Sequence, residues 1–131
     1  MDPTQEIAAM DFFQGHPAEF ALYRALMDAL EPRYDDLHIK VQKTQITLTN
    51  RRVFACASLP RKKCDGQPLL VTVGLGYRLD SPRVWMAVEP YPGRWTHHIL
   101  VRTPEEIDGE LLAWIDEAYA FANAKGQMRK K

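Results

Sequence analysis

Two adjacent histidines, His97 and His98, are the side chains in this 131-residue chain best suited to proton transfer. Imidazole titrates near neutral pH, so either ring is a candidate acid or base beside the cation of Lys43. The sequence shows no nucleophile, base and orienting group in a catalytic arrangement, and it contains neither a P-loop nor a complete dinucleotide-binding glycine motif. An enzyme that uses His97 or His98 beside Lys43 is therefore the alternative hypothesis, and whether the chain is catalytic stays open.

A metal site is not favoured by the spacing of the same histidines. Consecutive side chains of a strand point to opposite faces, so His97 and His98 cannot ligate one ion in ordinary strand geometry. The other two histidines and the two cysteines show no HxxxH or CxxC spacing. The sequence predicts no metal and no cofactor, and it places one of the adjacent histidines in the core and the other at the surface.

Anion binding is the chemistry suggested by Lys43, Thr44 and Gln45, which offer an ammonium, a hydroxyl and an amide where two strand patterns meet. Arg51 and Arg52 add planar donor groups that suit phosphate and carboxylate. The structural alternative is a turn in which Thr44 and Gln45 satisfy nearby backbone groups while Lys43 is solvated.

Aromatic and basic residues alternate further along the chain, at Arg83, Arg94 and Trp95. This composition suits a ligand with a ring and a negative charge, although arginines also hold irregular backbone together. We expect the basic residues and one histidine to converge on one depression. The candidate ligand-binding residues are Lys43, Thr44, Gln45, Arg51, Arg52, Arg83, Arg94, Trp95, His97 and His98.

The charges support that expectation because they are segregated along a chain of zero net charge. Residues 1–36 carry two basic and eight acidic side chains, residues 37–102 carry eleven and three, and residues 103–131 carry four and six. A basic centre favours an anionic ligand or an acidic partner. Pairing with acids of the flanking segments, such as Asp35, Asp36, Glu105 or Glu110, is the rival explanation.

The elements that must position these residues follow from hydrophobic periodicity. Helical spacing predicts a helix over 17–30, and a sheet region over 37–101 follows from period-two alternation in short strands. Thr103, Pro104 and Glu106 form a capping signal that predicts a second helix over 104–123. Residues 84–88 fit a short strand or a helical turn equally well.

One domain spanning residues 1–131 is expected from the length. The fold class is α+β, in two layers, with an antiparallel sheet of four to five strands packed against two main helices. An N-terminal segment over 1–14 and a disordered basic tail over 126–131 flank it. The predicted core consists of Leu37, Ile39, Val41, Ile46, Leu48, Phe54, Val71, Val73, Ile99, Leu111 and Ile115.

Several short sequences are typical of one known family: FFQGHP, LYRAL, VQKTQITL, RRVFA, SPRV, PYPGRWTHHILV and IDGELLAWIDEAY. With these the chain resembles the domain of unknown function family 5655 from Phe12 to Phe121. The resemblance implies a compact helix-plus-sheet domain. It implies no activity, because none is established for the family.

The sequence therefore predicts a non-catalytic binding or interaction module for an anionic small molecule or nucleotide, or for an acidic partner. A nucleic-acid strand is less well supported, because the net charge is zero. No apolar stretch is long enough to span a membrane and no basic leader precedes one, so a cytoplasmic protein without membrane partners is expected. The sequence does not indicate the oligomeric state.

Overall fold

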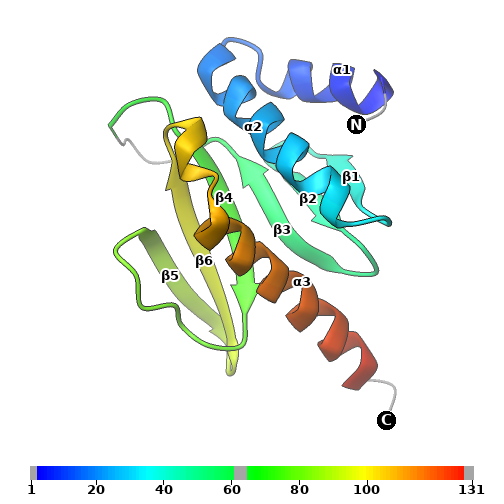
Figure 1. Cartoon of the computed structure of the whole chain (residues 1–131), viewed down its shortest axis with the longest axis vertical. Helices are drawn as coiled ribbons and strands as arrows, with labels where there is room; N and C mark the ends of the chain where they lie inside the picture. The colour runs from blue at the N-terminus through cyan, green and yellow to red at the C-terminus, as the bar shows by residue number, and fades with distance from the viewer. Residues whose placement is uncertain (1–2, 61–64, 129–131) are drawn as a thin grey trace.

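A computed structural model describes residues 3–60 and 65–128. Its three helices are α1 (Pro3–Phe12), α2 (Pro17–Leu30) and α3 (Gly109–Met128). Its six strands are β1 (His38–Val41), β2 (Ile46–Thr49), β3 (Val53–Ser58), β4 (Leu69–Leu75), β5 (Val84–Tyr91) and β6 (Arg94–Val101). All neighbouring strands are antiparallel, in the order β1-β2-β3-β4-β6-β5. The α+β class is confirmed, and the predicted four to five strands are corrected to six (Figure 1).

The additional strand is β5, in the segment whose sequence fitted a strand or a helical turn. It pairs only with β6 and forms one edge of the sheet. An edge strand tolerates proline, because one side of its backbone makes no ladder hydrogen bonds, and this explains how Pro90 fits within β5. The pairing of β5 with β6 is irregular at two places.

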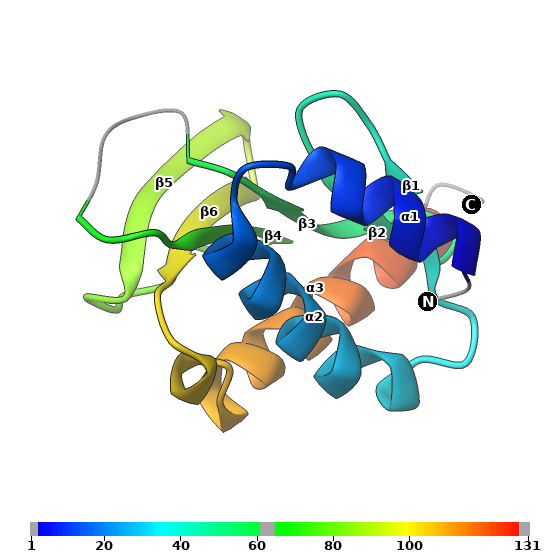
Figure 2. The same cartoon turned by 90° about the horizontal axis from the view of Figure 1, so that it is seen from above.

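The helices α2 and α3 lie on the same side of the sheet (Figure 2). The strand residues that face them are buried, as predicted, including Ile46, Leu48, Val71 and Ile99. The predicted core residues Leu37, Ile39 and Val41 are only half-buried, because β1 is an edge strand with one neighbour. Along β1, the Gln5 amide of α1 donates to the Ile39 carbonyl at 3.5 Å.

The last helix begins later than predicted. Residues Pro104–Glu106 form a 3₁₀ turn, in which the Glu106 carboxylate accepts the backbone N–H of Thr103 at 3.2 Å. Ile107 then leaves helical geometry, with ψ at 74°. Asp108 is the effective cap, because its Oδ1 accepts the Leu111 N–H at 3.0 Å.

The end of α3 also differs from the prediction. The helix continues to Met128, so the tail predicted to be disordered over 126–131 begins inside α3. Residues 129–131 lie outside the described residues. None of the helices described is both long and apolar enough to cross a membrane.

Candidate functional site

The face of the sheet opposite α2 and α3 carries a trough with a volume of about 430 Å³. The turn between β1 and β2, four of the strands and the residue after β3 contribute to it. Its lining residues are Thr44, Gln45, Ser58, Leu59, Leu70, Thr72, Trp85, Met86, Thr96 and His98. Three of these, Thr44, Gln45 and His98, are sequence-predicted site residues.

A single row of paired residues crosses all six strands at the trough. The register aligns Lys40 with Thr47, Thr47 with Cys56, Cys56 with Thr72, Thr72 with His98, and His98 with Met86. Side chains in one row of an antiparallel sheet share a face. Residues distant in sequence thus form one surface.

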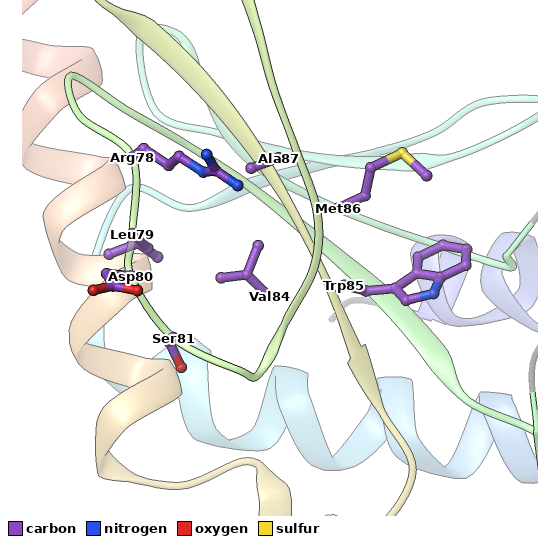
Figure 3. A pocket seen from close by; sticks show the side chains of 8 residues that line it. All are labelled: Arg78, Leu79, Asp80, Ser81, Val84, Trp85, Met86 and Ala87. Atoms are coloured by element: carbon purple, nitrogen blue, oxygen red, sulfur yellow. The ribbon is translucent and has the colours of Figure 1, made fainter.

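An irregularity in β5 explains why two consecutive side chains line the trough. The register shifts between Val84 and Met86, which frees Trp85 from strict alternation. Trp85 and Met86 also line a second cavity, of about 370 Å³, between residues 78–81 and β5. Figure 3 shows the Arg78 side chain of that cavity extending toward Ala87.

His98 brings its imidazole to the trough through a contact with Thr72, whose Oγ1 lies 3.0 Å from Nδ1. Burial lowers the pKa of His98, so the ring is neutral at pH 7 and offers both a donor and an acceptor. Burial also raises the pKa of Cys56, in the same row, to about 11. Cys56 is therefore a thiol near neutral pH and a poor nucleophile.

His97 lies on the opposite face and has no exposed surface. Its Nε2 accepts the backbone N–H of Leu79 at 2.9 Å, which ties the connection between β4 and β5 to the sheet. Because that lone pair is occupied, the proton of the neutral ring sits on Nδ1 and Nε2 is unavailable as a base. The structure therefore gives His97 a place in the core.

We expect His97 to make stability depend on pH. Burial is the main cause of its lowered pKa, so the unfolded chain binds a proton at this ring more readily than the folded chain does. The contribution of the neutral His97 ring to the free energy of unfolding is complete above the unfolded pKa of about 6.5. It is lost as pH falls, at up to about 1.4 kcal/mol per pH unit. Urea unfolding between about pH 7.5 and 5.5 should show that the free energy of unfolding depends less steeply on pH in His97→Gln than in the wild type. Equal slopes would contradict this assignment.

Arg83 is engaged by acids at the start of α3. Its Nη1 lies 2.9 Å from both Asp108 Oδ1 and Glu110 Oε1, and its Nη2 donates to the Glu106 carbonyl at 2.7 Å. The guanidinium also lies 5.6 Å from the ring centroid of Trp114. Pairing with acids of a flanking segment was the alternative explanation for the basic residues within 37–102. The contacts of Arg83 agree with that explanation for one of these charges.

The other predicted residues lie at different places. Lys43 and Thr44 occupy the tight turn between β1 and β2, which is closed by the Gln42 N–H and the Gln45 carbonyl at 2.9 Å. Arg51 lines a cavity beside Asp36, Asn50 and Asn123. Arg52 lies in the turn between β2 and β3, whose Asn50 N–H bonds to the Arg52 carbonyl.

Arg94 and Trp95 line a groove at one end of the sheet. The expected single depression is therefore not formed, because the predicted residues divide among the trough, the groove, the Arg51 cavity, two strand turns, the α3 ion pairs and the core. Within residues 3–60 and 65–128, no three His, Cys, Asp or Glu side chains gather as metal ligands would.

Fold and site together define an α+β domain with one face of its sheet covered by helices and the other hollowed into a trough. The chain belongs to the family described as Domain of unknown function (DUF5655), whose model matches residues 9–122, and the resemblance seen in the sequence is confirmed. No curated protein and no solved structure matches the chain significantly.

Proposed function

We propose that the domain is a non-catalytic binding module whose trough holds a small anionic ligand with a planar ring, of the size and chemistry of a nucleotide. The observation that carries the proposal is the convergence of neutral polar groups and an aromatic wall in one hollow. No acid occurs among the described residues that line it.

The size and lining of the trough suit such a ligand. A volume of about 430 Å³ falls within the range of small-molecule sites, which begins near 300 Å³. Leu59, Leu70, Trp85 and Met86 provide apolar surface for a ring, and Trp85 provides a stacking partner. The hydroxyls of Thr44, Ser58, Thr72 and Thr96, the Gln45 amide and the His98 ring provide hydrogen bonds to its edge.

Cations near one side of the trough suit the anionic part of the ligand. Lys43 directly precedes Thr44 in the turn between β1 and β2, and Lys40 lies in the row that crosses the trough. Trp85 comes from β5, at the opposite edge of the sheet. We therefore orient the ligand with its anion toward the β1–β2 turn and its ring toward β5.

The alternative, an enzyme that uses a histidine as acid or base, has support only at His98. Its contact with the Thr72 hydroxyl is a nucleophile–base geometry facing a hollow. Within the part of the chain that the structure describes, however, no carboxylate hydrogen-bonds to the His98 ring to orient it. The binding function is therefore favoured over catalysis.

Calorimetric titration with AMP tests the proposal. We expect saturable binding with a Kd below about 1 mM that weakens as salt rises, and weaker binding of adenosine or inorganic phosphate alone.

Thr72→Val should weaken AMP binding about fivefold or more, because it removes a hydroxyl from the trough. Thr49→Val is the matched control, since Thr49 is a strand threonine outside the trough that bonds to the His38 carbonyl. Absence of binding at millimolar AMP, or equal effects of the two variants, would contradict the proposal.

A further inference from the structure

We propose that a second site, which shares only Thr96 with the trough, docks an acidic protein segment through one of its aromatic side chains. The site is the end groove, of about 250 Å³, where the β5–β6 hairpin, the ends of β3 and β4 and the second half of α3 meet. Its lining residues are Val53, Phe54, Gly74, Leu75, Pro90, Tyr91, Arg94, Trp95, Thr96, Ala118, Phe121 and Ala122.

The strand register brings the end groove together. Leu75 pairs with Trp95 and Arg94 pairs with Tyr91, so the end of β4 and the β5–β6 turn meet there. Val53 begins β3 at the same end of the sheet.

Large apolar side chains remain exposed at the rim of the end groove. Tyr91 is 64% exposed and Val53 is 51% exposed. Val88, which pairs with the lining residue Thr96, is 44% exposed. An apolar, aromatic patch with arginine at its edge is the composition of protein–protein contact sites.

The volume of the end groove selects the kind of occupant. About 250 Å³ lies below the range of small-molecule sites, whereas the trough lies within it. A single aromatic side chain fits a hollow of this size. The remainder of the partner would then lie across the exposed rim.

The charges around the end groove call for an acidic partner. Arg94 lines it, the Arg78 guanidinium lies 5.8 Å from the Trp95 ring centroid, and Arg52 directly precedes Val53. Within residues 3–60 and 65–128, these three arginines form no ion pair, whereas Arg24, Arg33 and Arg83 each pair with an acid.

Two acids near the end groove accept hydrogen bonds from neutral donors. Glu89 accepts the Gly93 N–H at 3.1 Å within the β5–β6 hairpin, and Glu117 accepts the Tyr77 hydroxyl at 2.6 Å. Both carboxylates keep their charge in these contacts, but Arg52, Arg78 and Arg94 outnumber them, which leaves a net positive charge for an acidic segment of a partner.

Fluorescence anisotropy with a fluorescein-labelled peptide, Glu-Asp-Phe-Asp-Glu-amide, tests the docking site. We expect saturable binding that weakens about fivefold or more in Arg94→Gln and in Tyr91→Ser, both changes at the surface. Arg24→Gln removes the same charge from α2, outside the end groove, and should leave the affinity unchanged within about twofold. Peptides with Ala in place of Phe, or with Lys in place of the acids, should bind weakly.

Equal affinity for wild type and Arg94→Gln, or equal binding of the Lys peptide, would overturn the docking site, as would no binding at millimolar peptide. AMP titration of Arg94→Gln keeps the two sites apart. The trough should bind AMP with unchanged affinity in this variant, because Arg94 does not line it. Loss of AMP affinity in Arg94→Gln would overturn the separation of the two sites.

Discussion

Replacement of His97 by alanine is expected to lower the free energy of unfolding by about 3 kcal/mol. The ring has no exposed surface, so its removal leaves a cavity in the core. The Leu79 N–H also loses its acceptor, and an unpaired buried donor is costly in itself. A loss of this size is a large share of the stability of a typical small domain.

The adjacent His98→Ala is the matched control for His97→Ala, since the two rings occupy neighbouring positions on opposite faces. His98 lies on the open face and contacts Thr72, so its loss should cost about 1 kcal/mol. Urea unfolding of both variants measures the difference. If His98→Ala is at least as destabilising as His97→Ala, the placement of His97 in the core is wrong.

Replacement of Arg83 by methionine should lower the free energy of unfolding by about 2 kcal/mol. Methionine keeps apolar contact with Trp114 but removes the donors to Asp108, Glu110 and the Glu106 carbonyl. The Arg83 side chain is only 23% exposed, which sets it apart from ordinary surface ion pairs. The start of α3 should fray first, because these acceptors lie in and before its first turn.

Arg24→Met provides the control for Arg83→Met. Arg24 pairs with Glu6 at 3.2 Å, but its side chain is 56% exposed. Exposed pairs contribute about 1 kcal/mol or less. Urea unfolding should therefore give Arg83→Met a much lower free energy of unfolding than Arg24→Met. Similar midpoints would show that the Arg83 contacts contribute little to stability.

Local periodicity predicted much of the fold. The helix over 17–30 matches α2, because proline at its start and helical apolar spacing agree. The alternation within 94–101 placed His97 with Ile99 on one face and His98 on the other, as the structure shows. Both signals depend only on residues close together in the chain.

Properties set by long-range pairing were not predictable. The strand β6 inserts between β4 and β5, and no local pattern specifies this order. The trough depends on it, because Thr72, His98 and Met86 become neighbours only through it. Alternation in 69–75 could have placed Thr72 on the open face, but not beside His98.

The start of α3 shows how two strong local signals compete. Thr103 and Glu106 form the expected capping box, but it begins only a 3₁₀ turn, and Asp108 caps the α-helix five residues later. The ion pair of Asp108 with Arg83 favours the later start. The same pair joins an arginine of the basic segment to an acid of the C-terminal segment. A count of charges along the sequence cannot distinguish such a pair from a charge that is available to a ligand.

The central claim is that the trough binds the ligand, and the three tryptophan indoles test it most directly. Trp85 lines the trough, Trp95 lines the end groove, and Trp114 is buried beneath Arg83. In ¹H–¹⁵N NMR spectra, AMP should shift the Trp85 indole together with the Thr44 and His98 amides, and leave the Trp95 and Trp114 indoles in place. Shifts at the Trp95 indole without any at Trp85, or no shifts at millimolar AMP, would contradict the account.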